Sequence, residues 1–187
     1  MSTEPTTEPK TSLRPLIITV VLVLAAVGLL YVMSLDKLPP EGMRAGNTCP
    51  EIAGLDAEGK PIKLSEYRGK VVLVSFWATW CPPCRKLLPH EREMVTVKYK
   101  DRPFVLLGVA ADAPDTLKGF LKTNPMPWPN IADDQGVIGK QWQVDSIPSA
   151  VLVDHEGVIR RTWIGNGLDP GEVWYAVDPL VVDAEKK

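Results

Sequence analysis

The chain has few histidines and cysteines, and its positive and negative charges nearly balance. Its 187 residues include only two histidines and three cysteines, and its formal net charge is −2. Three cysteines are too few for a disulfide scaffold, and two histidines leave little scope for a histidine-rich metal site. The near-neutral charge gives no reason to expect nucleic acid as a partner. Hydrophobic residues make up 45% of the chain, which is enough for a buried core.

Two of the three cysteines, Cys81 and Cys84, are separated by only two residues. A β-type apolar run over 71–77 precedes them, and a stretch predicted to be helical, from 85 to about 100, follows. The spacing places Cys81 at or just before a helix N-terminus, where unpaired backbone N–H groups stabilise a thiolate and lower its pKa. Cys84, one turn later, can attack a mixed disulfide. The motif is typical of a dithiol–disulfide exchange centre.

Pro82 and Pro83 lie between the two cysteines, and neither has a backbone N–H. Within the motif, the nearest donor left to the Cys81 sulfur is the Cys84 amide. Fewer donors predict a less stabilised thiolate, and therefore a reducing rather than a strongly oxidising couple. A pKa near ~3.5 for the Cys81 thiol, the extreme of strong oxidants, would contradict this prediction.

A structural zinc half-site is the alternative interpretation of the cysteine pair. Such a site needs two more ligands at suitable spacing. The chain offers only Cys49, His90 and His155, without a second Cys-x-x-Cys or a His-x-x-x-His. We therefore expect no metal, and we expect no cofactor because the dithiol itself stores two electrons.

The first 48 residues differ in composition from the rest. Residues 1–12 predict a disordered tail, because nothing in them can bury surface. Residues 13–35 are almost wholly apolar and long enough to span a bilayer, and they predict a single N-terminal transmembrane helix. A cleaved signal peptide is the rival, but no good cleavage site follows the run. A linker over 36–48 and a globular domain over 49–183 complete the expected organisation.

The basic residues that flank the predicted anchor do not set its orientation. Lys10 and Arg14 precede it, and Lys37 and Arg44 follow it, so the positive-inside rule gives a tie. We expect the domain on the periplasmic or extracytoplasmic side of the cell (inner) membrane, because a tethered dithiol makes most chemical sense there.

The pattern of the remaining chain predicts an α/β domain with a mixed sheet between helices. Strands over 71–77 and 104–110 enclose the active-site helix and form a βαβ unit with a right-handed crossover. The other expected elements are a hairpin over 49–64, helices over 113–123 and 136–142, an antiparallel strand pair over 150–154 and 158–164, and a last helix from 169.

Together these motifs resemble the thioredoxin fold and, more narrowly, the TlpA/ResA-like membrane-anchored thiol–disulfide oxidoreductases. The likeness covers roughly 49–182. It rests on the run Val74 to Arg85 with its Trp-Cys-Pro-Pro-Cys, on Pro89, on Met126-Pro127-Trp128-Pro129, on Ser146 to Asp154 and on Glu156-Gly157.

The resemblance implies a central mixed β-sheet flanked by helices, with Cys81 as the attacking thiol and Cys84 as the resolving thiol of a redox-active disulfide. It also implies a cis peptide bond at Ile147–Pro148. A cis proline turns the chain sharply and has no N–H, so the Ile147 backbone could pair with an extended substrate chain. The expected supporting and substrate-binding residues around the dithiol are Trp80, Pro82, Pro83, Ile147 and Pro148. We expect Trp77 and Trp80 to pack around the dithiol and exclude water.

Two positions depart from the family pattern. Thioredoxins carry a buried Asp where this chain has Ser75, and many ResA-like members carry a Glu where it has Leu87. In those proteins the acids help to move protons to and from the resolving thiol. We interpret Glu91 and Glu93, farther along the helix, as solvated charges, and we assign no acid–base residue. Cys49 is expected to be a buried, inert thiol, with a second redox thiol as the alternative.

The resemblance implies a membrane-tethered enzyme that reduces disulfides or cysteine pairs of exported proteins, such as apocytochromes c awaiting haem. A membrane electron donor would recharge it, and the lipid bilayer would hold its N-terminal helix. One rival is a peroxiredoxin-like thiol peroxidase, whose Pro-x-x-x-Thr-x-x-Cys motif fails at Val74 and Ala78. Another is a non-catalytic metal- or partner-binding module, such as a copper carrier, which would use a Cys-x-x-x-Cys spacing.

Overall fold

The computed structural model describes residues 14–35, 43–165 and 168–187. Two of the predicted segments fall outside these residues. They are the disordered tail expected over 1–12 and the first part of the expected linker, residues 36–42.

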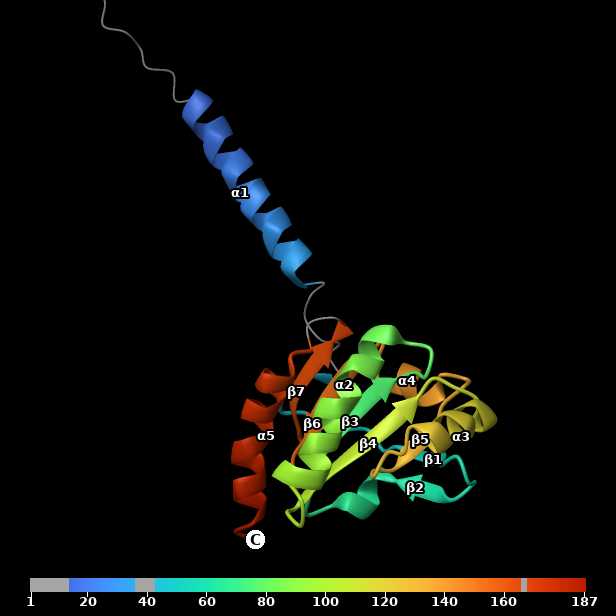
Figure 1. Cartoon of the computed structure of the whole chain (residues 1–187). Helices are drawn as coiled ribbons and strands as arrows, with labels where there is room; N and C mark the ends of the chain where they lie inside the picture. The colour runs from blue at the N-terminus through green and yellow to red at the C-terminus, as the bar shows by residue number, and fades with distance from the viewer. Residues whose placement is uncertain (1–13, 36–42, 166–167) are drawn as a thin grey trace, which may run out of the picture. The chain divides into compact units, whose positions relative to one another are not determined.

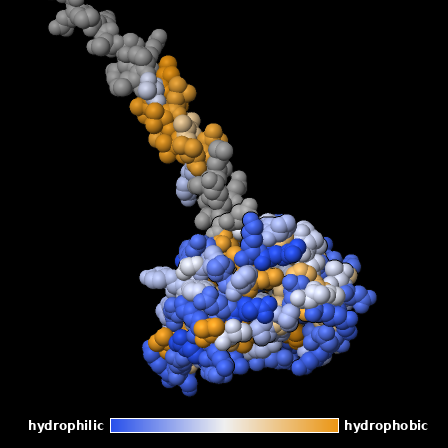
Figure 2. All heavy atoms as spheres, in the orientation of Figure 1, coloured by the Kyte–Doolittle hydropathy of each residue, from blue (hydrophilic) through white to orange (hydrophobic). Residues whose placement is uncertain are grey.

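The chain divides into two compact units, Met1–Leu38 and Pro39–Lys187. The described part of the first unit is the helix α1 (Arg14–Leu35). Its side chains at 17–31 are exposed and mainly hydrophobic, as Figure 2 shows. Among the described residues, no helix has both the length and the apolar character needed to cross a membrane. The membrane anchor expected over 13–35 therefore stays a prediction.

A five-stranded mixed sheet forms the centre of the second unit, in the order β5-β4-β3-β6-β7 (Figure 1). The central strand β3 runs parallel to β4 and antiparallel to β6, and all of its residues are buried because both faces of the sheet are covered. The mixed sheet confirms the predicted fold class. Its strands are β3 (Val71–Trp77), β4 (Phe104–Ala110), β5 (Asn130–Ala132), β6 (Ser149–Val153) and β7 (Ile159–Ile164).

Side chains of β3 alternate between two core layers, one on each face of the sheet. Leu73 points into a layer built with helices α2 (Pro82–Glu93) and α5 (Pro170–Ala184). Val74 points into the opposite layer, to which helix α4 (Val137–Gln141) contributes. These helices thus cover opposite faces of the sheet. A π-helical segment, Met94–Lys98, extends α2. Helix α3 (Pro114–Thr123) places Leu117 in a third, smaller cluster, which holds the two active-site cysteines.

The predicted hairpin is present, and one further strand was missed. Strands β1 (Ala53–Leu55) and β2 (Pro61–Lys63) pair antiparallel, and a 3₁₀ turn, Leu64–Tyr67, leads to β3. The missed strand is β5, which pairs with Gly108 to Ala110 of β4. It has only three residues and directly follows a proline-rich loop, so its sequence carries no period-2 pattern.

Residues 43–48, in the second part of the expected linker, pack against the domain. The Met43 side chain is 2% exposed and belongs to the core layer that contains Val74. The Gly46 N–H donates to the Ile159 carbonyl at 2.8 Å, and Thr48 forms a bridge with Val158. The compact part of the chain thus includes residues before Cys49.

Candidate functional site

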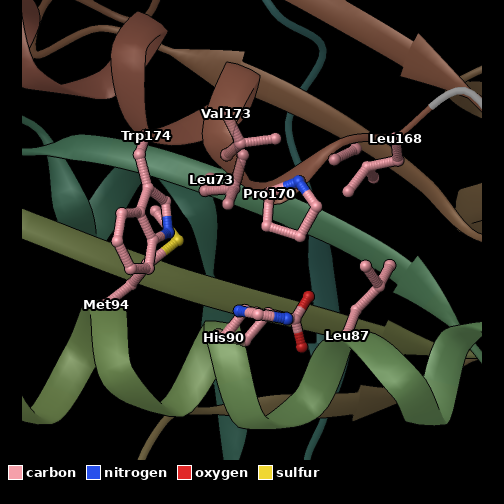
Figure 3. Close-up of a pocket in the computed structure, with 10 residues that line it drawn as sticks. Leu73, Leu87, His90, Met94, Leu168, Pro170, Val173 and Trp174 are labelled. Carbon is pink, nitrogen blue, oxygen red and sulfur yellow. The ribbon is translucent and has the colours of Figure 1, made fainter.

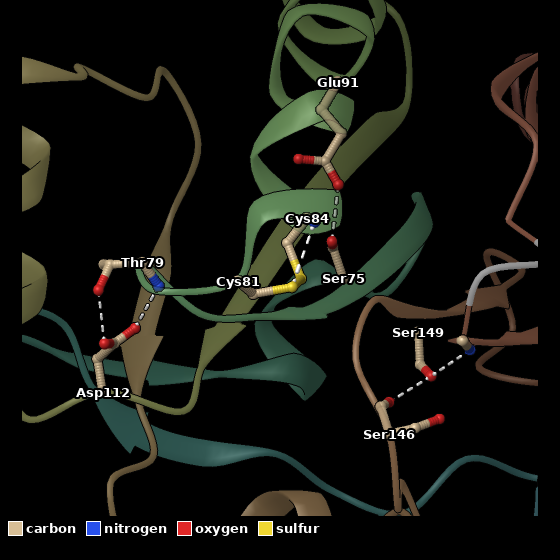
Figure 4. The surroundings of a disulfide bond; sticks show 9 residues. Ser75, Thr79, Cys81, Cys84, Glu91, Asp112, Ser146 and Ser149 are labelled. Atoms are coloured by element: carbon tan, nitrogen blue, oxygen red, sulfur yellow. Dashed lines mark hydrogen bonds between the residues drawn. A yellow bond between two sulfur atoms is a disulfide. The ribbon is translucent and has the colours of Figure 1, made fainter.

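The two motif cysteines lie where β3 leads into α2, as predicted. Cys81 is the N-cap residue of α2, because Pro82 and Pro83 have the helical φ in advance and need no N–H partner in the first turn. A disulfide joins Cys81 to Cys84, whose Cα atoms are 5.3 Å apart (Figure 4). The Cys84 N–H donates to the Cys81 sulfur at 3.2 Å, which confirms the expected donor.

The tryptophans on either side of the motif turn have opposite environments. Trp77 is 3% exposed and packs in one cluster with both cysteines, as expected. Its Nε1 donates to Asn130 Oδ1 at 3.1 Å, so β5 helps to hold it. Trp80, in contrast, is 66% exposed. Trp80 is not a member of the cluster that holds the cysteines, which corrects the expectation that it packs around the dithiol.

A buried aspartate holds the loop before Cys81. Asp112 is 5% exposed and lies two residues after the end of β4. Its carboxylate accepts the Thr79 N–H at 2.8 Å and the Thr79 hydroxyl at 2.7 Å, as Figure 4 shows. Sequence reasoning missed this contact. A signal existed, because β3 and β4 are predicted parallel neighbours and their carboxyl ends must meet at one edge of the sheet.

The proline loop lies beside the dithiol, and its Ile147–Pro148 peptide bond is cis, as predicted. Ile147 is half-buried and packs against the cluster that holds both cysteines, whereas Pro148 is buried. The Ser149 hydroxyl donates to the Ser146 carbonyl at 2.7 Å and accepts the Gly165 N–H at 3.3 Å (Figure 4). These bonds connect the loop to the end of β7.

A cavity of about 300 Å³ opens beside the proline loop. Ile147 lines it together with Phe76 and Trp77 from the end of β3. Lys140 and Asp145 contribute charged groups to its wall. The cavity therefore combines an apolar base with polar sides, next to the backbone that would receive a substrate chain.

Glu91 is not a solvated charge, which corrects the prediction made for it. It is partly buried, and the Ser75 hydroxyl donates to its Oε1 at 2.7 Å. Burial raises the pKa of the Glu91 carboxyl to about 7, although the Ser75 hydrogen bond acts in the opposite direction. Glu93 is exposed, as expected. The missed signal is the helical spacing, since Glu91 lies seven residues after Cys84 on the buried face.

The other candidate ligands do not assemble into a metal site in the described part of the chain. No group of three or more His, Cys, Asp or Glu residues there is placed to hold an ion. Cys49 is buried and free, as expected. Burial raises the pKa of its thiol, and a hydrogen bond from Arg68 partly opposes this effect.

Comparisons with known proteins agree with this geometry. The sequence model of the AhpC/TSA family matches residues 45–162. The thiol–disulfide oxidoreductase ResA of Bacillus thuringiensis subsp. konkukian (strain 97-27) is 35% identical over 120 residues, which cover 64% of this chain and 69% of that protein.

Solved structures of similar fold are also related in sequence. A crystal structure described as a thiol:disulfide interchange protein DsbE from Chlorobium tepidum has a TM-score of 0.64 and 29% identity, and the match covers 76% of this chain and 98% of that one. The pneumococcal exposed lipoprotein thioredoxin of Streptococcus pneumoniae strain TIGR4 has a TM-score of 0.61 and 25% identity, over 70% of this chain and 100% of that one. Since the family match spans more than half of the chain and the dithiol lies at a helix N-terminus in a thioredoxin-like sheet, the chain belongs to the AhpC/TSA family and is a ResA-like thiol–disulfide oxidoreductase of the thioredoxin superfamily.

Proposed function

We propose that this oxidoreductase is tethered to the cell membrane and reduces disulfides of exported proteins. Cysteine pairs of apocytochromes c awaiting haem are one such substrate class, and a membrane electron donor would restore the dithiol. The observation that carries the reducing direction is the hydrogen-bond count at Cys81. Of the three residues that follow Cys81, only Cys84 donates a backbone hydrogen bond to its sulfur, because Pro82 and Pro83 have no N–H. A thiolate with few donors makes the disulfide the more stable state, which favours a reductant.

The site residues take the following roles in this proposal. Cys81 attacks a substrate disulfide, and a mixed disulfide forms while one substrate thiolate leaves. Cys84 then attacks the Cys81 sulfur, the second substrate sulfur leaves, and the Cys81–Cys84 disulfide remains. Two electrons pass from the enzyme dithiol to the substrate. Both cysteines are buried, with Cys81 3% and Cys84 2% exposed, so the roles follow from position: Cys81 is the N-cap residue of α2, and Cys84 is the third residue of the helix.

The residues around the dithiol would hold the substrate chain. The backbone of Ile147 pairs with an extended segment, since Pro148 after it has no N–H to be left unpaired. Trp80 is exposed beside Cys81 and presents an aromatic face to a protein partner, as exposed aromatics at interfaces do. Pro82 and Pro83 are exposed too and complete that surface.

The proposed location rests on chemistry and on α1. The side chains at 17–31 are exposed and mainly hydrophobic, and a lipid bilayer would cover them. One relative of known structure is described as an exposed lipoprotein, which fits a tethered domain outside the cytoplasm. We therefore place the dithiol on the extracytoplasmic side of a single-pass anchor.

The reduction potential of the purified chain against glutathione tests the direction. A value near ~−270 mV fits a reductant, whereas one near ~−120 mV fits an oxidant and would overturn the proposal. A Cys84→Ser variant should trap partner proteins on Cys81, and a Cys81→Ser variant should trap none. Reduced cysteine pairs in exported proteins should become scarcer in cells that carry only the Cys81→Ser form.

The peroxidase alternative has no support at the positions it needs. Val74 and Ala78 stand where that motif has Pro and Thr, and both are buried apolar side chains. Neither can donate a hydrogen bond to a peroxide. Consumption of peroxide with a thiol donor, at a rate that depends on Cys81, would reopen this alternative.

A further inference from the structure

A hydroxyl and a carboxyl group meet inside the core behind the dithiol. Ser75 is 5% exposed and lies in the middle of β3, between Gly108 of β4 and Ala150 of β6. Its hydroxyl donates to Glu91 of α2 at 2.7 Å. Polar groups in an apolar core cost free energy unless they are paired, and all other residues of β3 are hydrophobic. The pair therefore calls for an explanation beyond packing.

The pair lies on the Cys84 side of the disulfide. Glu91 follows Cys84 by seven residues, so both are on one face of α2 and about 10 Å apart along its axis. Helical side chains lean toward the helix N-terminus, which brings the Glu91 carboxyl back toward Cys84. Ser75 approaches from the strand beneath the helix. In Figure 4 the Ser75 hydroxyl points toward the Glu91 carboxyl, and Cys84 is the motif cysteine nearer to this pair in that view.

We propose that Glu91, acting through the Ser75 hydroxyl, accepts the proton of the Cys84 thiol when Cys84 resolves the mixed disulfide. This inference rests on the proposed function. In the step, the Cys84 sulfur bonds to the Cys81 sulfur, and the bond between Cys81 and the substrate sulfur breaks. The electron pair of that bond stays with the substrate thiolate. Ser75 takes the Cys84 proton and passes its own to Glu91, which returns it to the departing thiolate or to solvent.

The surroundings of Glu91 suit a group that takes and releases protons. It lines a narrow cavity of about 20 Å³ between α2 and α5, shown in Figure 3, which has room for about one water molecule. Leu73 and Ala150 of the sheet and Leu168, Val173 and Trp174 on the α5 side supply apolar walls to this cavity. His90 of α2 is the other titratable residue that lines it. A pKa of about 7, which burial causes, leaves the Glu91 carboxyl close to half ionised at neutral pH, where a general base is most effective.

The test separates the two chemical steps with a chromogenic aromatic disulfide, 5,5′-dithiobis(2-nitrobenzoate). The reduced full-length chain releases one coloured thiolate when Cys81 attacks and a second when Cys84 resolves the mixed disulfide. The second phase isolates proton loss from Cys84, because the aromatic thiolate leaves without needing a proton. The variants are Glu91→Gln, Ser75→Ala and, as a matched control on the exposed face of α2, Glu93→Gln. Each is followed by stopped-flow absorbance from acidic to alkaline pH.

We expect Glu91→Gln to slow the second phase about a hundredfold near neutral pH, within the usual range for a general base, and to remove an inflection near the pKa of Glu91. Ser75→Ala should slow the second phase in the same pH range. The first phase should stay unchanged in both variants, and Glu93→Gln should match the wild type in both phases. If the second phase of Glu91→Gln kept the wild-type rate and the inflection in its pH–rate profile, the proposed proton transfer from Cys84 through Ser75 to Glu91 would be overturned.

The same experiment distinguishes this failure from a failure of the proposed function. If the wild-type chain released no first thiolate, or released it without Cys81, the exchange chemistry itself would be wrong. An unchanged first phase also reports that the variants are folded around Cys81. If Glu91→Gln lost both phases, the Ser75→Ala variant would test the proposal instead, because it removes only a hydroxyl from the strand. A second phase of unchanged rate in Ser75→Ala would then overturn the proposal.

Discussion

The second residue of α2 controls how many donors the Cys81 sulfur can have. An N-cap side chain accepts hydrogen bonds from the second or third N–H of its helix. In this chain the second is Pro83, which has none, and the third is Cys84, which donates. The first position, Pro82, would not reach the sulfur even if it had an N–H. The two adjacent prolines therefore differ in their expected effect on the redox couple.

A Pro83→Ala substitution should make the couple more oxidising. The new N–H adds one hydrogen bond to the Cys81 thiolate, worth about 1 kcal/mol, which corresponds to a rise of roughly 20 mV for a two-electron couple. Equilibration with glutathione measures the shift. Pro82→Ala is the matched control and should leave the potential nearly unchanged. Equal shifts in both variants would show that donor number is not the cause.

Glu91 should make the stability of the protein depend on pH. Burial raises the pKa of this carboxyl from 4.5 to about 7, so the folded state binds its proton more tightly than the unfolded state does. Stability is then highest below the unfolded pKa, falls as pH rises toward the folded pKa, and levels off above it.

The Glu91→Gln variant should not show this loss. The difference in unfolding free energy between Glu91→Gln and the wild type should shift in favour of the variant by on the order of 3 kcal/mol between about pH 4 and about pH 8. Urea unfolding at the two pH values measures the difference, and Glu93→Gln serves as the exposed control. A constant difference between Glu91→Gln and wild type would mean that the carboxyl does not titrate in this range.

At the scale of elements, the short loop between β3 and α2 is fixed by a neighbouring strand. Asp112, just after β4, accepts both the backbone N–H and the hydroxyl of Thr79. Since Thr79 is two residues before Cys81, the contact sets where α2 begins. The parallel β3–β4 pair and the active-site helix thus form one structural unit, with the dithiol at its carboxyl edge.

An Asp112→Ala substitution should loosen this unit. Two hydrogen bonds to a buried carboxylate are lost, and we expect a destabilisation of on the order of 2 kcal/mol. Hydrogen exchange at the Thr79 amide should become faster. In the reduced chain, the preference of an alkylating reagent for Cys81 over Cys84 should decrease. Asp134, an exposed aspartate in the loop before α4, provides the control, because its replacement by Ala should change neither quantity. If hydrogen exchange at the Thr79 amide were the same in Asp112→Ala as in the wild type, the Asp112 hydrogen bonds would not be what holds this loop.

At the scale of the whole molecule, the boundary between the two compact units predicts that they can be separated. Residues 39–187 contain the complete sheet and the dithiol, and the core includes Met43 but no described residue of the first unit. A chain shortened to 39–187 should therefore keep its thermal midpoint and its Cys81–Cys84 exchange activity.

The full-length chain should, in contrast, sediment with membranes. High salt should not release it, whereas detergent should, because apolar side chains rather than charges would hold it. The shortened chain should stay in the supernatant. Recovery of the full-length chain in the supernatant of cells broken without detergent would contradict the anchor proposed for residues 13–35.

The sequence alone predicted the elements around the dithiol, because each depends on neighbouring residues. The apolar run 71–77 predicts a buried strand, and the helical stretch that follows the motif places Cys81 at a helix N-terminus. A βαβ unit and one short antiparallel connection together predict a mixed sheet. The cis bond at Ile147–Pro148 followed from the resemblance, and the structure contains it. Within the motif, the sequence also left the Cys84 amide as the nearest backbone donor to the Cys81 sulfur, because a proline has no N–H.

Tertiary structure decided which polar groups meet behind the dithiol. Ser75 and Glu91 are 16 residues apart, and Thr79 and Asp112 are 33 apart, so each contact exists only after α2 and β4 have packed on β3. Trp80 was expected to pack around the dithiol and is exposed, and Glu91 was expected to be solvated and is partly buried. Local sequence patterns place a residue on an element, but its exposure and its pKa depend on what the other elements bring against it.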